Sequence, residues 1–309
     1  MVFRLKISRS FFEQKTEDRN LQTQITTSSW KSGWTVLAIA VLAIVGLQAC
    51  EAETDEVRLG YVLWDSEIAS THVVAAVIQD ELGHDVNLTA VDAGPMWTGM
   101  ARGDFDAIVA AWLPGTHAAY LEQTQDDIVN LGPNLEGAKI GWVVPAYVPV
   151  NSIEELNDYV DEFGGEITGI DPGAGLMAAS EEAVDAYDLN YNLLSGSDAA
   201  MTAALERAID REEWIIVTGW TPHWKFAAHD LKYLEDPRNV FGDAEHIATI
   251  VTPDLQERLP DVFSFLDNFF WTPDEMGEVM IYIEEGMEPM DAARQWISEN
   301  ENRVQQWLN

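Results

Sequence analysis

From Val57 onward the chain alternates short apolar runs with longer amphipathic stretches, and this alternation is the feature that most limits its fold. The runs have the length of β-strands and the stretches have the periodicity of α-helices. Such alternation predicts mostly parallel sheets covered by helices. From Pro253 onward only helices are expected. The expected strands are 57–63, 86–91, 106–111, 167–170 and 214–218, and the expected helices are 68–82, 95–102, 176–187, 198–209, 274–285 and 290–308.

Two halves of this region resemble each other. In the first half a strand ends at Trp64 and a later apolar strand ends in a Trp-x-Pro sequence at Trp112. In the second half Pro172 and Trp220 occupy the corresponding positions at the same spacing. The pattern indicates two related α/β lobes, although two such units can also be alike by chance. In open α/β sheets, ligands bind at the carboxyl ends of the strands, where these residues lie.

The first 50 residues are typical of a secretory signal that ends at a lipid attachment site. Basic residues precede an apolar run, 36–47, that is too short for a comfortable membrane span. The single cysteine, Cys50, follows Leu-Gln-Ala, which resembles the bacterial lipobox. We therefore expect a signal peptide over 1–49, a lipidated Cys50, an acidic tether over 50–56, and the rest outside the cytoplasmic membrane. The alternative is an uncleaved anchor with an incidental cysteine.

The charge balance excludes a nucleic-acid partner. The chain carries 17 Lys and Arg against 53 Asp and Glu, for a net charge of -36, and phosphate neutralisation needs clustered bases. One cysteine excludes both a disulfide framework and a cysteine-based zinc cluster. The 12 tryptophans are more informative, since Trp is the best cation-binding ring.

Three loops place a tryptophan at the end of an apolar strand, where the ring is expected to project into a cleft between the lobes. These are Trp64, Trp112 and Trp220. One such ring could simply pack in a core. Three converging rings indicate a site for a quaternary ammonium group, which cannot donate hydrogen bonds and is held by electron-rich faces.

A fourth loop, 171–175, lies between a strand and a helix and contains two glycines. The free N–H groups of Gly175 and Leu176 are expected to form an anion site at the helix N-terminus. No Walker pattern and no lysine accompany them, so a carboxylate is favoured over a phosphate. His117 is expected to begin a helix and could donate to the same carboxylate, although a lone histidine more often caps a helix or packs in a core.

An enzyme is the competing class, for example a hydrolase that uses His117 or His223 with Asp65 or Asp171. The sequence has no Gly-x-Ser-x-Gly elbow, no His-Glu-x-x-His pair and no Cys–His set, so nucleophilic and zinc chemistry lack their usual residues. We expect no enzymatic activity, no cofactor and no metal.

Taken together, the loop sequences resemble those of the glycine betaine-binding proteins of ABC importers, from about Val57 to the C-terminus. The matching segments are Leu59 to Ser70, Ala93 to Thr98, Ala111 to His117, Gly169 to Gly173, Thr218 to Trp224 and Trp271 to Glu278. Each segment alone is weakly diagnostic, whereas the set is specific.

The resemblance implies a two-lobed type II periplasmic-binding-protein fold with the ligand in the interlobe cleft. It implies lobe 1 over 57–147 plus 250–309 and lobe 2 over 148–249, in the order of the unpermuted members of the family. Hinges are expected near Val144-Pro145 and Ala248–Ile250. The implied partners are glycine betaine and a membrane permease. Proline betaine, choline or carnitine as ligand, and a ligand-sensing role, remain open.

The resemblance also assigns site residues. It implies that Trp64, Trp112 and Trp220 surround the trimethylammonium group, and that the backbone of Gly175 and Leu176 and the side chain of His117 bind the carboxylate. The remaining aromatic and acidic residues near these loops receive structural roles. Asp65 and Glu67 are expected to cap the following helix, Trp97 and Trp224 to pack the lobes, and Trp271, Trp296 and Trp307 to lie in the core.

Overall fold

The computed structural model describes residues 56–309. The expected signal peptide, Cys50 and all of the tether except Glu56 lie outside this range. No helix within residues 56–309 is both long enough and apolar enough to cross a membrane.

One group of strands forms the sheet of the first lobe, which we define by strand pairing. Parallel β1 (Val57–Tyr61) lies between β2 (Val86–Ala90) and β3 (Ala107–Leu113), and β3 pairs antiparallel with β9 (Glu245–Val251). The first part of β4 (Val129–Pro145) continues this sheet by pairing with β9 up to Ala138. The helices of this lobe are α2 (Asp65–Val77) with a π-helical turn (Ile78–Leu82), α3 (Ala93–Arg102), α4 (Ala118–Thr124), α8 (Leu255–Arg258), α9 (Pro260–Asn268), α10 (Pro273–Glu284), α11 (Pro289–Glu299) and α12 (Glu301–Leu308).

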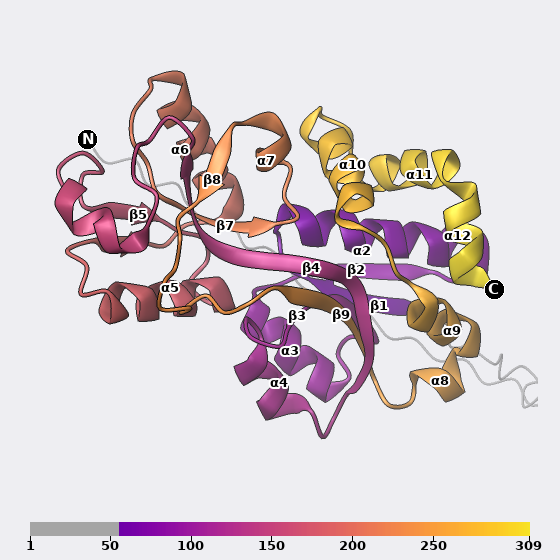
Figure 1. The fold of residues 1–309 in the computed structure, drawn as a ribbon. Helices are drawn as coiled ribbons and strands as arrows, with labels where there is room; N and C mark the ends of the chain where they lie inside the picture. The colour runs from indigo at the N-terminus through magenta and orange to yellow at the C-terminus, as the bar shows by residue number, and fades with distance from the viewer. Residues whose placement is uncertain (1–55) are drawn as a thin grey trace, which may run out of the picture. The chain divides into compact units, whose positions relative to one another are not determined.

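The second lobe contains the sheet built on the other part of β4. From Lys139 onward β4 pairs antiparallel with β7 (Val217–Thr221) and β8 (Leu231–Tyr233), and β7 continues through parallel β5 (Glu166–Thr168) to β6 (Asn192–Leu194). Its helices are a 3-10 segment (Ile153–Tyr159), α5 (Gly175–Ala186), α6 (Asp198–Asp210) and α7 (Lys225–Ala228). Figure 1 shows β4 running from one lobe into the other.

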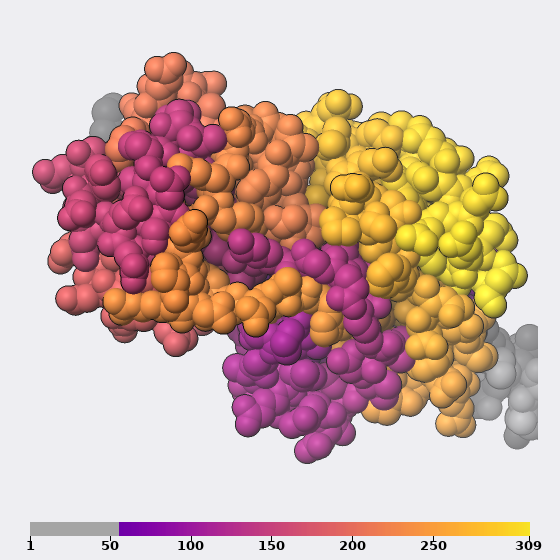
Figure 2. Space-filling view, in the orientation of Figure 1, coloured from indigo at the N-terminus to yellow at the C-terminus, as the bar shows by residue number. Residues whose placement is uncertain are grey.

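The sheet therefore differs from the mostly parallel arrangement predicted from sequence. Every pairing of β4 and β9 is antiparallel, and neither strand was expected. The sequence of β4 does not show the regular alternation of a strand, because Gly132 and Gly137 interrupt it. Both glycines adopt positive φ and accompany register shifts in the pairing with β9. Figure 2 shows β4 in magenta and β9 in orange, next to each other on the surface.

Most expected helices are confirmed, and one expected helix and one expected strand differ in detail. The helix expected over 290–308 is divided into α11 and α12 at Asn300, whose φ of -123° and ψ of 34° are not helical. The strand expected at 214–218 begins only at Val217, and the Trp214 ring before it packs against Tyr159 and Phe163.

The core of the first lobe contains the tryptophans that were expected there. The side chains of Trp97, Trp271 and Trp296 are completely buried and Trp307 is nearly so. Trp296 packs edge-on against Trp271 and stacks on Trp307. In the same lobe, α10 and α11 pack on α2, so the C-terminal helices support the helix that follows Trp64.

Candidate functional site

A pocket lies where the carboxyl ends of strands from both lobes meet. It includes about 280 Å³ of space not filled by protein atoms, part of it open to solvent. None of the side chains that line it is charged. They are Trp64, Trp112, Thr116, Ile140, Ile170, Ala174, Gly175, Leu176 and Trp220. Five of the predicted site residues are thus brought together in one place.

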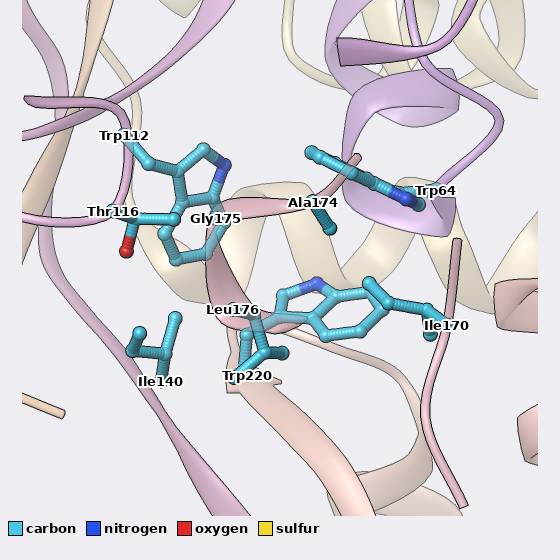
Figure 3. Close-up of a pocket in the computed structure, with 9 residues that line it drawn as sticks. All are labelled: Trp64, Trp112, Thr116, Ile140, Ile170, Ala174, Gly175, Leu176 and Trp220. Atoms are coloured by element: carbon cyan, nitrogen blue, oxygen red, sulfur yellow. The ribbon is translucent and has the colours of Figure 1, made fainter. Parts of the chain in front are cut away.

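The three tryptophans form an aromatic wall. Trp64 follows β1 and is the N-cap of α2, whereas Trp112 and Trp220 are the penultimate residues of β3 and β7. The ring centroids of Trp64 and Trp220 are 6.4 Å apart with an interplanar angle of 55°. Figure 3 shows the three rings around one common space. The ends of β3 and β7 fix the backbone of Trp112 and Trp220, and the start of α2 fixes that of Trp64.

The indole N–H groups are all engaged outside the pocket. Trp64 Nε1 donates to Asp171 Oδ1 at 2.7 Å and Trp112 Nε1 donates to Glu67 Oε1 at 2.9 Å. Trp220 Nε1 donates to Ser66 Oγ at 3.2 Å. Because these donors are occupied, the tryptophans offer the pocket their ring faces, which suits a ligand group that accepts no hydrogen bonds.

The predicted capping role of Asp65 and Glu67 is wrong. Both lie in the first turn of α2, but the helix has no side-chain cap. Their carboxylates accept hydrogen bonds from tryptophans instead, Asp65 from Trp224 and Glu67 from Trp112. Glu67 is completely buried, and this burial raises its pKa to about 8. These acids therefore orient rings, and the expected packing role of Trp224 includes this hydrogen bond between the lobes.

The opposite wall of the pocket is the N-terminus of α5. Within the described residues, the backbone N–H groups of Gly175 and Leu176 make no backbone hydrogen bond, as expected for the first turn of a helix. The 12-residue helix adds the positive end of its dipole. A Cβ on Gly175 would lie 1.9 Å from the carbonyl oxygen of Thr116 in the other lobe, so only glycine fits this contact.

His117 lies beside the pocket rather than among its lining residues. It is completely buried and is the N-cap of α4. Its Nδ1 accepts a hydrogen bond from Trp112 N at 3.1 Å, which places the ring proton on Nε2, and Nε2 has no partner in the described part of the chain. Burial lowers the His117 pKa to about 3, so the ring is neutral. It stacks on Trp64, with centroids 6.2 Å apart.

Four lining residues were not predicted from the sequence, namely Thr116, Ile140, Ile170 and Ala174. Thr116 and Ala174 each adjoin a predicted site residue, so proximity in the loop could have indicated them. Ile140 lies on β4, a strand that the sequence did not reveal, and its place in the pocket could not be predicted without that strand.

Of the residue pairs considered for hydrolysis, His223 and Asp65 lie near each other, but away from the pocket. His223 Nε2 lies 3.2 Å from Asp198 Oδ1 and 3.8 Å from Asp65 Oδ2, and none of the three lines the pocket. These three side chains are also the one group with metal-ligand spacing among residues 56–309. The neighbouring Lys225 is completely buried.

The fold and the pocket define a class of protein. A chain with two α/β lobes that meet over one small uncharged pocket is a substrate-binding protein of the periplasmic type. Residues 55–299 match the family of the substrate binding domain of the ABC-type glycine betaine transport system. The chain belongs to this family, whose members are substrate-binding proteins that serve transport on the outer side of the membrane.

Individual relatives agree with this assignment. The chain is 46% identical over 155 residues to the glycine betaine/carnitine transport binding protein of Listeria monocytogenes, an alignment that covers 49% of this chain and 52% of that protein, about half of its length. It matches lactococcal OpuAC in its closed conformation complexed with glycine betaine at a TM-score of 0.79 and 43% identity, over 82% of this chain and 99% of the other. It matches the glycine betaine, L-proline-binding protein of Borrelia burgdorferi at a TM-score of 0.79 and 34% identity, over 82% and 97%. The family resemblance and the fold predicted from sequence are confirmed.

Proposed function

We propose that this chain captures glycine betaine outside the cell and delivers it to the permease of an ABC importer. The pocket carries this proposal, because its two ends match the two ends of the ligand. Three ring faces without free donors form one end, and the N–H groups of Gly175 and Leu176 form the other. A quaternary ammonium suits the first end and a carboxylate suits the second.

His117 is assigned to the carboxylate end. A buried N–H without a partner costs about 1–3 kcal/mol, and the Nε2–H of His117 is such a group. An acceptor that enters the pocket would remove this cost. Because the ring is neutral, its contribution is a directed hydrogen bond and not an ion pair.

The magnitudes are compatible with this ligand. Three desolvated cation-π contacts contribute about 1–2 kcal/mol each, and charge-assisted hydrogen bonds contribute about 1.5–3 kcal/mol each. Together they exceed the roughly 8 kcal/mol of a micromolar complex before ordering costs are subtracted.

Closure of the lobes around the ligand is the proposed mechanism. We place the moving boundary where strand pairing changes, between Ala138 and Lys139 on β4 and just before Glu245 on β9. On both strands this boundary lies earlier in the sequence than the hinges expected near Val144-Pro145 and Ala248–Ile250. It also lies earlier than the expected lobe limits at 147/148 and 249/250. We also propose that a lipid on Cys50 holds the chain at the membrane.

Calorimetric titration with glycine betaine and choline tests the proposal. Choline keeps the ammonium but lacks the carboxylate, so the donors of Gly175, Leu176 and His117 stay unpaired, and glycine betaine should bind at least about tenfold more tightly. Proline betaine and carnitine, titrated in parallel, rank the alternative ligands. Equal affinity for choline would reject the carboxylate site, and absence of betaine binding would reject the function.

A variant of His117 sharpens the test. In His117→Asn the shorter side chain can still accept from Trp112 N but lacks the Nε2 donor, so it should weaken glycine betaine binding and leave choline binding unchanged. Trp296→Ala is the matched control, because this core residue should lower the melting temperature, with a cost of about 3–5 kcal/mol, and keep both affinities in the folded protein.

A further inference from the structure

Lys225, at the start of α7, is a buried cation placed against the aromatic wall. Its side chain is completely buried, and its Nζ has no hydrogen-bond partner among the described residues. Nζ lies 4.1 Å from the centroid of the Trp220 ring and 5.8 Å from that of Phe226. Lys225 does not line the pocket, whereas Trp220 does, so the lysine approaches the ring from outside the pocket.

Hydrogen bonds connect this lysine to three polar residues, His223, Asp198 and Asp65. Lys225 N donates to His223 Nδ1 at 3.2 Å, so His223 carries its proton on Nε2 and donates to Asp198 Oδ1 at 3.2 Å. Asp198 Oδ2 also accepts from the backbone N of Asp65 at 3.0 Å, across the two lobes. We call Asp65, Asp198, His223 and Lys225 the buried charge cluster.

The protonation states of the buried charge cluster follow from its surroundings. Burial lowers the pKa of Lys225 to about 7 and that of His223 to about 4, and it raises the pKa of Asp65 to about 6. The neighbouring His223 and Lys225 hold the pKa of Asp198 below its usual value against the effect of burial. Outside the cluster, Glu284 on α10 acts on Asp65, and Glu67 titrates behind Trp112. Near neutral pH, Asp198 is therefore an anion and Lys225 is partly charged.

A ring that binds cations on both faces binds each of them less well. The attraction comes from one shared electron distribution, and two positive charges on either side of the ring also repel each other in a medium of low dielectric constant. Because no lining side chain of the pocket is charged, the nearest charges to a ligand at Trp220 include those of the buried charge cluster.

We propose that the buried charge cluster sets the strength with which the aromatic wall holds a quaternary ammonium, with Lys225 weakening and Asp198 strengthening the interaction through Trp220. Lys225 is a positioning and tuning residue that does not touch the ligand. The inference rests on the proposed function and adds to it a determinant of affinity behind the ring.

A pair of ligands of the same shape isolates the charge effect. In 3,3-dimethylbutanoate a carbon replaces the nitrogen of glycine betaine, so it keeps the carboxylate and the three methyl groups but has no positive charge. The ratio of its dissociation constant to that of glycine betaine reports only on the cation. Any effect on stability or lobe closure acts on both ligands and cancels in the ratio.

Measured near pH 6, where Lys225 is mostly charged, Lys225→Met should raise this ratio severalfold and Asp198→Asn should lower it, as expected for removing one charge near a buried cation. The double variant Lys225→Met/Asp198→Asn should return close to the wild-type ratio. Lys232→Met is the control, because its Nζ contacts Asn151 away from the pocket, and its ratio should not change. Ratios within twofold of wild type for both single variants would overturn the proposal.

Proton release from the unmodified protein provides a second measurement that needs no variant. Coupling is reciprocal, so a tenfold effect of the Lys225 charge on the ligand means that the ligand lowers the Lys225 pKa by about one unit. Calorimetry near pH 6.5 in buffers of different ionisation enthalpy should show about half a proton more released by glycine betaine than by 3,3-dimethylbutanoate. Equal release would contradict the inference while leaving betaine binding, and hence the proposed function, intact.

Discussion

At the scale of single residues, Gly175 shows how closely the lobes approach each other at the site. Its backbone lies against the Thr116 carbonyl of the other lobe with no room for a side chain. Gly173, two residues earlier in the same loop, is different, because a Cβ built there has no neighbour within 4 Å. Substituting each glycine in turn therefore distinguishes the effect of the close contact at Gly175 from a general effect on the loop.

Gly175→Ala should weaken glycine betaine binding by at least about tenfold, since inserting a methyl group into a filled contact costs about 1–3 kcal/mol. The closed state carries this cost, so the melting temperature without ligand should change little. Calorimetry and thermal unfolding measure the two effects. Gly173→Ala should match wild type in both, and an unchanged affinity for Gly175→Ala would contradict the observed contact.

Sequence reasoning at this scale succeeded where a strand end determines the position of a side chain. Trp64, Trp112 and Trp220 could be placed because each ends an apolar run. The roles of Asp65 and Glu67 could not, since the choice between a helix cap and an indole N–H depends on which rings lie near the carboxylate in three dimensions. Burial of this kind leaves no local signal in the sequence.

At the scale of elements, β9 links β4 to the loop before α4, which contributes Thr116 to the pocket. Glu245, its first residue, accepts hydrogen bonds through Oε1 from Gly115 N at 2.8 Å and Thr116 N at 2.7 Å, and through Oε2 from Thr116 Oγ1 at 2.7 Å. The loop before α4 is thus held by β9, the strand that pairs with β4. This fixes Thr116 in the pocket.

Glu245→Ala should weaken glycine betaine binding severalfold and lower the melting temperature, because it leaves three donors of this loop unpaired, at about 1–3 kcal/mol for each one that stays buried. Glu245→Gln keeps an oxygen for the two backbone N–H groups and an amide that can pair with the Thr116 hydroxyl, so it should recover most of the affinity. Equal losses in the two variants would show that the negative charge, and not the hydrogen-bond geometry, is what holds the loop.

Helices and strands could be predicted where their pattern of apolar and polar residues is regular. The α10 helix is confirmed, and its start is fixed by a capping box between Thr272 and Glu275. The β4 strand was missed because Gly132 and Gly137 interrupt its pattern, although pairing with β9 and β7 makes it the longest strand in the described residues. Tertiary pairing compensates for local sequence that disfavours a strand.

At the scale of the whole molecule, the proposed lipid on Cys50 determines where the protein is found. It would hold an acidic chain at the membrane surface near its permease. Cys50→Ser should release the protein into the medium or leave an unprocessed precursor. Fractionation and the size on a gel measure this, and unchanged retention together with unchanged size would reject the anchor.

The lobes are closed in this structure, and hydrogen bonds between them explain how. Trp64 and Trp224 donate across the interface to Asp171 and Asp65, and the Tyr120 hydroxyl donates to the carbonyl oxygen of Gly173 at 2.8 Å. These contacts join the lobes beside the pocket, so their separation would widen the path of a ligand into it. A free protein that exchanges between open and closed states is the expected consequence.

Spin labels on the two lobes can measure this exchange. With Cys50→Ser removing the single natural cysteine, labels at Gln123→Cys on α4 and Glu182→Cys on α5 occupy exposed positions on helices that both start at the pocket. Glycine betaine should shorten and narrow the distance distribution, because bound ligand favours the closed state by its differential affinity.

Two comparisons decide whether a shortened distance is lobe closure. A pair within the first lobe, Gln123→Cys with Glu257→Cys, should give the same distribution with and without ligand, since no boundary lies between α4 and α8. Adding Gly175→Ala to the interlobe pair should keep the long distances even with saturating betaine, because its methyl group occupies the contact that closure requires. If the interlobe distances are identical with and without glycine betaine in the wild-type background, the ligand enters a molecule that does not move, and the boundary at Ala138–Lys139 is not a hinge.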